Sequence, residues 1–158
     1  MVTAVQKLIV CFVLVLSLSM SFALAEEVTF HLNVPNSGNI QVGDTFQVQV
    51  LLDITTGKSI KQAEFQLTPN ANANLPSASS GNLFIGATAL YGAAGQVQGQ
   101  GIRFGETTAS DQDPVTIGDQ GVEGNDKLFA IVTGTATAVG SVTLTFSNLV
   151  AMKGSFVR

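Results

Sequence analysis

The sequence has no tryptophan and, among 158 residues, only one cysteine, one histidine and one tyrosine. The cysteine is Cys11, which lies in an apolar run near the N-terminus, so residues 26–158 contain no thiol. A domain formed by those residues can hold no internal disulfide. We therefore expect its stability to rest on a hydrophobic core.

The scarcity of histidine and cysteine also limits the chemistry that the chain can perform. A Ser-His-Asp site would need His31, which falls among the outward positions of a strand pattern, and no Gly-x-Ser-x-Gly motif is present. Zinc sites need several His or Cys ligands. A glycosidase needs two facing carboxylates. Asp53, Glu64 and Glu106 are available, but their sequence spacing cannot place any two of them together, and surface carboxylates are common. We expect no catalytic residue, no metal site and no cofactor, so the chain is not predicted to be an enzyme.

Aromatic content and charge argue against two further classes of ligand. Most phenylalanines fall at inward positions of the strand patterns, and Tyr91 is the only tyrosine, so little is available to stack on sugar rings. The formal net charge of −4 becomes −5 once Lys7 is removed with an export signal. An acidic chain is a poor partner for nucleic acid or for an anionic membrane surface. Sugar binding is disfavoured, and nucleic-acid binding is not expected.

The first 25 residues are typical of an export signal. Lys7 precedes an almost unbroken apolar run over residues 8–16, and residues 23–25 read Ala-Leu-Ala, a cleavage pattern. An uncleaved membrane anchor is the alternative, and the small residues at the cleavage site argue against it. We expect residues 1–25 to be a signal peptide and residues 26–158 to form one secreted domain, extracellular or at the cell surface. Membrane contact would arise only through an uncleaved signal segment.

Residues 40–67 hold the clearest pattern of the chain, two alternating runs joined by a polar turn. The inward residues of the first run are Phe46, Val48, Val50 and Leu52. In the second run, Ala63, Phe65 and Leu67 alternate with the outward residues Gln62, Glu64 and Gln66. A period of two predicts strands with one buried and one wet face. Two such strands in succession predict an antiparallel pair.

The rest of the chain repeats this pattern with interruptions. Residues 28–34 alternate cleanly, residues 127–137 are apolar on both faces as in a central strand, and residues 149–157 could form a last short strand. Residues 68–101 are small and polar, which predicts a long connection with one or two short strands, the run 83–85 among them. No amphipathic helical pattern follows the signal. We predict an all-β fold, a β-sandwich with jelly-roll topology.

Residues 110–126 form an acidic segment that contains glycine. Its carboxylates are Asp111, Asp113, Asp119, Glu123 and Asp126, oxygen ligands of the kind that calcium prefers. The first two are spaced as in a calcium loop, but Pro114 and Thr116 break the EF-hand pattern. A solvated acidic loop is the simpler interpretation, and calcium binding is the alternative.

Four stretches follow one another along most of residues 28–150: VGDTFQVQVLLD, SIKQAEFQLTPNAN, GIRFGETTAS and DKLFAIVTGTATAVGSVTLTFSNLVA. In this order they resemble the strands of the cohesin domain, the extracellular jelly-roll module that binds dockerin modules. No single motif is specific, but the ordered set is more so. The Gly/Ala-rich residues 87–101 depart from the family pattern.

The resemblance implies a non-catalytic module that binds another protein, with a dockerin-type partner. In that family one sheet face grips the dockerin, and the contact residues carried over by motif are Gln62, Glu64 and Glu106. An amphipathic helical partner would then lie across the Gln62/Glu64 face, with Glu106 at its edge. The alternatives are a carbohydrate-binding module with a polysaccharide ligand, a structural surface protein, and a polar sheet face that only contacts water.

Overall fold

The computed structural model describes residues 28–35, 40–55, 59–84, 86–107, 115–116 and 124–153. The expected signal peptide lies outside the described residues, as does most of the acidic segment 110–126. The described part contains strands and turns but no helix, and so no helix in it could cross a membrane. The all-β prediction is confirmed.

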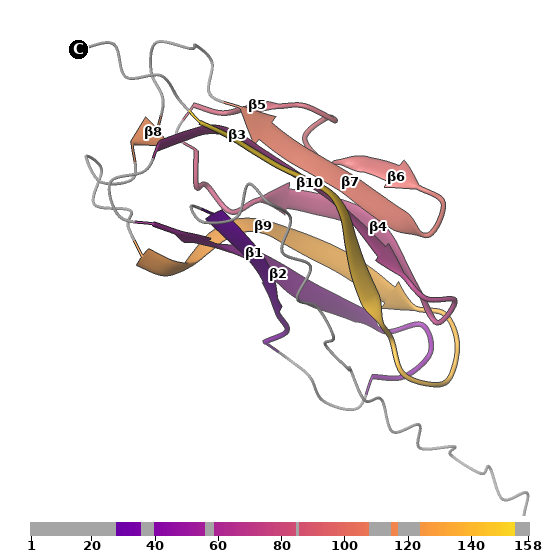
Figure 1. The fold of residues 1–158 in the computed structure, drawn as a ribbon. Coiled ribbons are helices and arrows are strands. Elements are labelled where there is room, and N and C mark those ends of the chain that lie inside the picture. The colour runs from indigo at the N-terminus through magenta and orange to yellow at the C-terminus, as the bar shows by residue number, and fades with distance from the viewer. Residues whose placement is uncertain are drawn as a thin grey trace, which may run out of the picture.

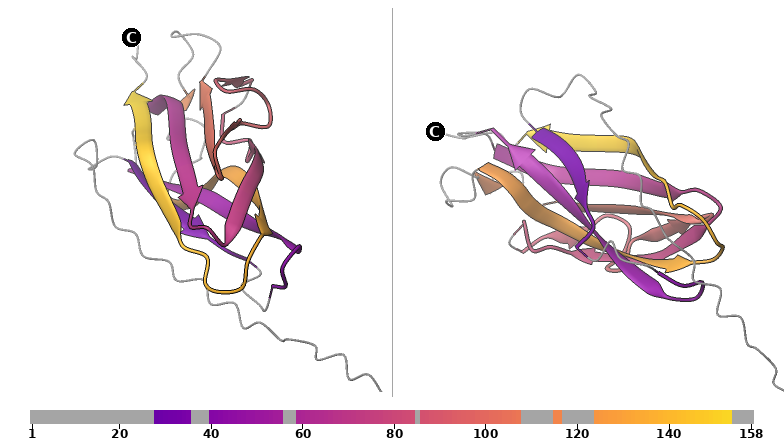
Figure 2. Two further views of the ribbon diagram at one scale, coloured as in Figure 1. Left: turned by 90° about the vertical axis from the view of Figure 1, so that its right-hand side faces the viewer. Right: turned by 90° about the horizontal axis from the view of Figure 1, so that it is seen from below.

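Two antiparallel sheets pack face to face (Figures 1 and 2). The four-stranded sheet has the order β1 (Val28–Asn33), β2 (Thr45–Ile54), β9 (Gly124–Ala136), β4 (Ala73–Ser80). The six-stranded sheet has the order β10 (Leu144–Lys153), β3 (Ser59–Pro69), β7 (Gly101–Thr107), β5 (Thr88–Ala89). Its two short additions are β6 (Gln96–Gln98) beside β7 and β8 (Val115–Thr116) beside β3. Consecutive strands of the chain therefore often lie in different sheets, as in a sandwich.

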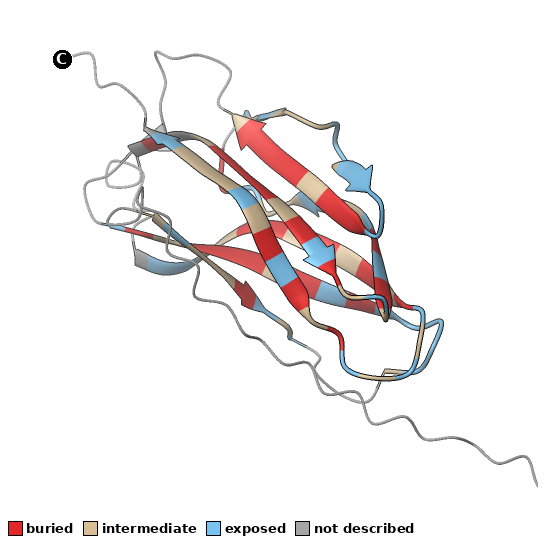
Figure 3. Cartoon of the chain, turned by 45° about the vertical axis from the view of Figure 1, so that its right-hand side comes forward, coloured by how far each residue is buried: buried red, intermediate tan, exposed pale blue. Residues whose placement is uncertain are grey.

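The core fills the space between the two sheets, and alternation along each strand decides which residues enter it (Figure 3). The predicted inward residues of β2 and β3 are all buried: Phe46, Val48, Val50, Leu52, Ala63, Phe65 and Leu67. Aromatic rings from both sheets meet edge to face at the centre, with ring centroids 6.0 Å apart for Phe65–Phe129 and 5.7 Å for Phe104–Phe129. Each buried phenylalanine stabilises the fold by about 1.5–3 kcal/mol, which fits a domain without disulfides.

The connection predicted over residues 68–101 contains more strand than the sequence pattern suggested. It holds β4, β5 and β6, and β4 is eight residues long. Its inward residues are Ala73, Leu75 and Ala78, so the apolar side chains that enter the core are mostly too small to mark a strand. Pro76 lies at a register shift, where the ladder needs no donor from it. Of the run 83–85, which was predicted as a strand, the structure describes Leu83 and Phe84. Neither is in a strand, and both pack into the core from a bend.

The last strand begins earlier than predicted, and a bulge in it determines which of its side chains lie on the outer face of the six-stranded sheet. A single strand, β10, runs from Leu144 to Lys153 with a register shift after Ser147, where Asn148 adopts a positive φ of 49°. The bulge lets Leu149 pack on the core while Val150 and Met152 lie opposite β3 residues of the outer face.

Candidate functional site

The candidate site is the outer face of the six-stranded sheet, where Gln62, Glu64 and Gln66 of β3 point away from the core. Their strand neighbours Ala63, Phe65 and Leu67 are fully buried, so alternation places these three on the opposite side. Register extends the face in both directions: Met152 and Val150 of β10 lie opposite Gln62 and Glu64, and Gly105 and Arg103 of β7 lie opposite Glu64 and Gln66.

Glu64 is the centre of a small polar cluster on this face. Its Oε2 accepts a hydrogen bond from the Tyr91 hydroxyl. The same oxygen forms an ion pair with Arg103 Nη2 at 3.0 Å. The Arg103 guanidinium also lies 4.3 Å from the centre of the Tyr91 ring, a cation–π contact. Burial and the hydrogen bond to Glu64 raise the pKa of the Tyr91 hydroxyl, so it stays a donor at neutral pH. The negative charge of Glu64 is therefore neutralised within the face, and its residue is only 8% exposed.

Gly105 makes room for this cluster. A Cβ at Gly105 would lie 2.7 Å from Glu64 Cβ and 3.1 Å from Leu90 Cδ1, so glycine lets both neighbours close over β7. The Leu90 N–H donates to the Gly105 carbonyl at 2.9 Å, which ties the segment after β5 to the strand. That segment carries Tyr91. The Gly/Ala-rich stretch without a recognisable pattern thus covers the β7 side of the face, and sequence reasoning missed Tyr91 and Arg103 as its polar residues.

The β10 side of the face is more open. Met152 is 43% exposed beside Gln62. The Asn148 side-chain amide donates to Gln66 Oε1 at 2.8 Å, which orients the Gln66 amide. The surface that remains accessible is an amide-rich strip on β3 flanked by apolar side chains of β10. Such a surface offers hydrogen bonds and modest apolar area, with little net charge.

Glu106 does not join Gln62 and Glu64 on this face, which corrects the expectation that it lies at the edge. It lies directly opposite the inward Ala63 and two residues after the inward Phe104, so its side chain points between the sheets. The residue is 5% exposed, and Glu106 Oε2 has no hydrogen-bond partner in the described part of the chain. Burial raises the pKa of this carboxyl, and a hydrogen bond with Ser80 opposes that shift.

Solved structures that match this arrangement include several cohesin modules. The sixth cohesin of scaffoldin B from Acetivibrio cellulolyticus, solved in complex with a dockerin, is 14% identical and superposes with a TM-score of 0.55 over 77% of this chain and 82% of that one. The chain has the cohesin fold. A cohesin module from a Clostridium perfringens family 33 glycoside hydrolase gives 15% identity and a TM-score of 0.54 over 81% and 83% of the two chains.

The cohesin fold extends beyond scaffoldins. A non-cellulosomal cohesin from the archaeon Archaeoglobus fulgidus is 16% identical, with a TM-score of 0.54 over 82% of this chain and 83% of that one. No known family model matches the sequence, and no curated protein does. The jelly-roll sandwich is therefore confirmed by structural likeness, at low sequence identity.

Proposed function

We propose that this chain is a non-catalytic protein-binding module, and that it binds its partner through the outer face of β10, β3 and β7. The observation that carries the proposal is the cohesin fold combined with the accessible strip of Gln62, Gln66 and Met152 on one sheet face. A cohesin of the same fold, from Acetivibrio cellulolyticus, was solved with a dockerin bound. A dockerin-type partner, an amphipathic helical module, is the partner class that this likeness supports.

We propose different roles for the three predicted contact residues. Gln62 offers its amide beside Met152, whereas Glu64 supplies its carboxylate to Tyr91 and Arg103 and presents those groups to a partner. Since the carboxylate is already paired, a partner needs no basic residue to match it. For Glu106 we propose a role inside the sandwich, since its side chain faces the core.

Secretion is part of the same proposal. Residues 1–25 act as a cleaved signal, and residues 26–158 fold outside the cytoplasm, where dockerin-type partners could be met. Polysaccharide binding stays a prediction that the described surface does little to favour. The phenylalanines that surround the sandwich centre are buried, and the ring of Tyr91 is engaged by Arg103.

Affinity capture from the native secretome tests the proposal, with residues 26–158 as bait and mass spectrometry of the eluate. Recovery of a protein with paired calcium-loop helices is the expected result. Its affinity for the Gln62→Ala variant should then fall about tenfold, or about 1.4 kcal/mol, as for a contact near the interface centre.

Gln47→Ala is the matched control, because Gln47 is an exposed mid-strand glutamine on the other sheet. It should change the affinity less than twofold. Equal losses for the two variants, or recovery of no protein above background, would contradict binding through this face.

A further inference from the structure

The only histidine of the sequence lies between two carboxylates on the opposite side of the molecule, the outer face of the four-stranded sheet. His31 comes from β1, Asp53 from the neighbouring β2 and Asp126 from β9, at one end of the sheet. His31 Nε2 lies 2.7 Å from Asp126 Oδ1, and His31 Nδ1 lies 3.5 Å from Asp53 Oδ2. One ligand atom from each residue lies within 4.8 Å of the others.

The two distances distinguish the two ring nitrogens. A neutral imidazole has one N–H donor and one lone pair. The 2.7 Å contact is an ordinary hydrogen bond, and a neutral ring that donates it to Asp126 carries its proton on Nε2. In that tautomer the lone pair is on Nδ1, whose distance of 3.5 Å to Asp53 Oδ2 is too long for a good hydrogen bond. Nδ1 and Oδ2 are then both free to bind a cation that lies between them.

The gap has the size that a transition-metal ion needs. Zinc binds imidazole nitrogen and carboxylate oxygen at about 2.1 Å, and tetrahedral geometry then separates two ligands by about 3.4 Å. The Nδ1–Oδ2 separation of 3.5 Å matches that spacing. A carboxylate that accepts the other N–H of the imidazole, here Asp126, is the usual outer-shell partner of a metal-binding histidine, where it fixes the ring and its tautomer.

A backbone hydrogen bond holds the Asp53 carboxylate in this arrangement. Asp53 Oδ1 accepts the Asp126 N–H at 2.8 Å, so only Oδ2 of Asp53 is turned to the imidazole. His31 and Asp53 keep about a third of their side-chain surface exposed, at 33% and 35%, so an ion can reach the gap from solvent.

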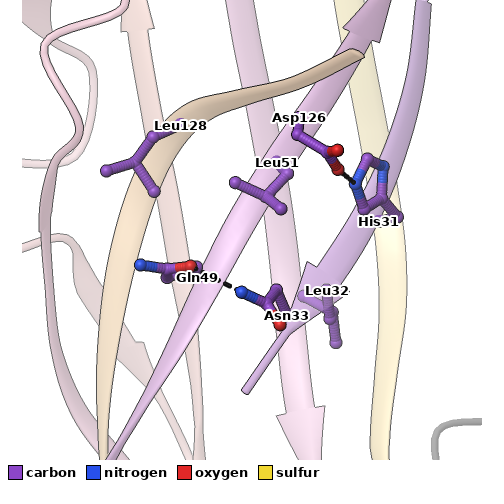
Figure 4. Close-up of a pocket in the computed structure, with 7 residues that line it drawn as sticks. All are labelled: His31, Leu32, Asn33, Gln49, Leu51, Asp126 and Leu128. Carbon is purple, nitrogen blue, oxygen red and sulfur yellow. Dashed lines mark hydrogen bonds and ion pairs between the residues drawn. The ribbon is translucent and has the colours of Figure 1, made fainter. Parts of the chain in front are cut away.

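The site borders an open hollow of about 610 Å³, whose lining includes His31, Asp126, Leu51 and Leu128 (Figure 4). Asn33 and Gln49 also line it, and the Asn33 amide donates to Gln49 Oε1 at 2.8 Å. In Figure 4, His31 and Asp126 point toward one another. An ion with two side-chain ligands would fill its remaining positions with water from this side, or with a donor group from another molecule.

We propose that His31 Nδ1 and Asp53 Oδ2 bind a divalent transition-metal ion of the zinc type, with Asp126 as the residue that positions the imidazole. The imidazole ligand favours such ions over calcium and magnesium, which take oxygen ligands. This site is separate from the proposed protein-binding face, since it lies on the other sheet, and it does not depend on that function.

Titration of the full-length chain with Zn²⁺ tests the proposal, in a Cys11→Ser background that removes the only thiol. Because His31 is the only histidine, its ring protons give one unambiguous pair of NMR signals. We expect Zn²⁺ to shift them at 1:1 stoichiometry while Ca²⁺ does not. Calorimetry should show a loss of affinity beyond about 100-fold for His31→Ala and Asp53→Asn, and of about 10–100-fold for Asp126→Asn.

Asp44→Asn is the matched control, because Asp44 is an exposed aspartate outside the cluster, in the turn before β2. Its affinity for Zn²⁺ should be unchanged. Asp53→Asn keeps the oxygen that can accept the Asp126 N–H, so it tests the ligand even if His31→Ala unfolds. Zinc binding that survives both substitutions, or the absence of any shift of the His31 signals at millimolar Zn²⁺, would overturn the site.

Discussion

Glu106 is the residue whose environment fits its chemistry least, and this has a measurable consequence. Burial raises the pKa of its carboxyl in the folded state above the unfolded value. The folded state therefore binds the proton more tightly, and stability is lost as the pH rises from the ordinary carboxyl pKa of 4.5 through the raised pKa of the folded state. Glu106→Gln removes the charge, so we expect urea unfolding to show about 1 kcal/mol more stability at pH 7 and no gain at pH 4.

Glu64→Gln provides the contrast at the same scale. Glu64 is also buried, but its charge is matched by Arg103 and by the Tyr91 hydroxyl. Its neutralisation should lower stability at pH 7, opposite in sign to Glu106→Gln. If both variants shifted stability in the same direction, the distinction between a buried carboxylate matched by Arg103 and one held only by Ser80 would be wrong.

At the scale of the element, the β7 strand depends on the absence of a side chain at Gly105. The Gly105→Ala substitution would place a methyl group 2.7 Å from Glu64 Cβ and 3.1 Å from Leu90. Overpacking of this kind lowers stability by about 1–3 kcal/mol. We expect a lower Tm and a loss of the Tyr91–Glu64 contact, visible as a Tyr91 hydroxyl pKa closer to the ordinary value of 10.0 in a spectrophotometric titration.

The exposed position Gln98 on the neighbouring β6 offers the control for this prediction. Gln98→Ala should leave both the Tm and the Tyr91 titration unchanged. A Gly105→Ala variant with native Tm would show that the segment after β5 can move away from β7 without loss, and that its packing over Glu64 is not tight.

Among the strands, alternation in the sequence predicted those whose inward faces carry large apolar side chains. It identified β1, and also β2 and β3, where Phe46, Val50 and Phe65 mark the inward faces. β9 was indicated instead by a run that is apolar on both faces. Alternation missed β4, because the inward residues of that strand are mostly alanine, which marks a buried face less clearly than a large apolar residue does. The Glu64–Tyr91–Arg103 cluster was out of reach for a further reason: its partners lie 27 and 39 residues from Glu64, and only the fold brings them together.

Glu106 shows a different kind of error. Ile102 and Phe104 are inward residues of β7, and a period of two places Glu106 inward as well. The family resemblance implies a contact residue at Glu106 instead. Local periodicity was the better guide to the direction of its side chain, since a regular strand cannot turn one side chain to the other face without a bulge.

At the scale of the whole molecule, the two proposed sites lie on the outer faces of different sheets, with the core between them. The sheets of a sandwich pack about 10 Å apart, and the rings at the centre are tightly interlocked, as in the Phe104–Phe129 pair. Coupling between two sites needs a part of the structure with two arrangements that both ligands bias. The cluster at His31 and the strip at Gln62 share no residue or strand.

We therefore expect the two binding events to be independent. The affinity for the captured partner, measured by calorimetry, should change less than twofold between saturating Zn²⁺ and a chelator that removes it. His31→Ala should bind the partner as the native chain does. If the affinity for the partner depended on Zn²⁺ in the His31→Ala variant as well, the ion would be bound by the partner. If His31→Ala abolished a dependence of this affinity on Zn²⁺, the partner would have to reach around the sheet edge and complete the coordination of the ion. The reason is that a rigid, close-packed sandwich offers no other route between its two outer faces.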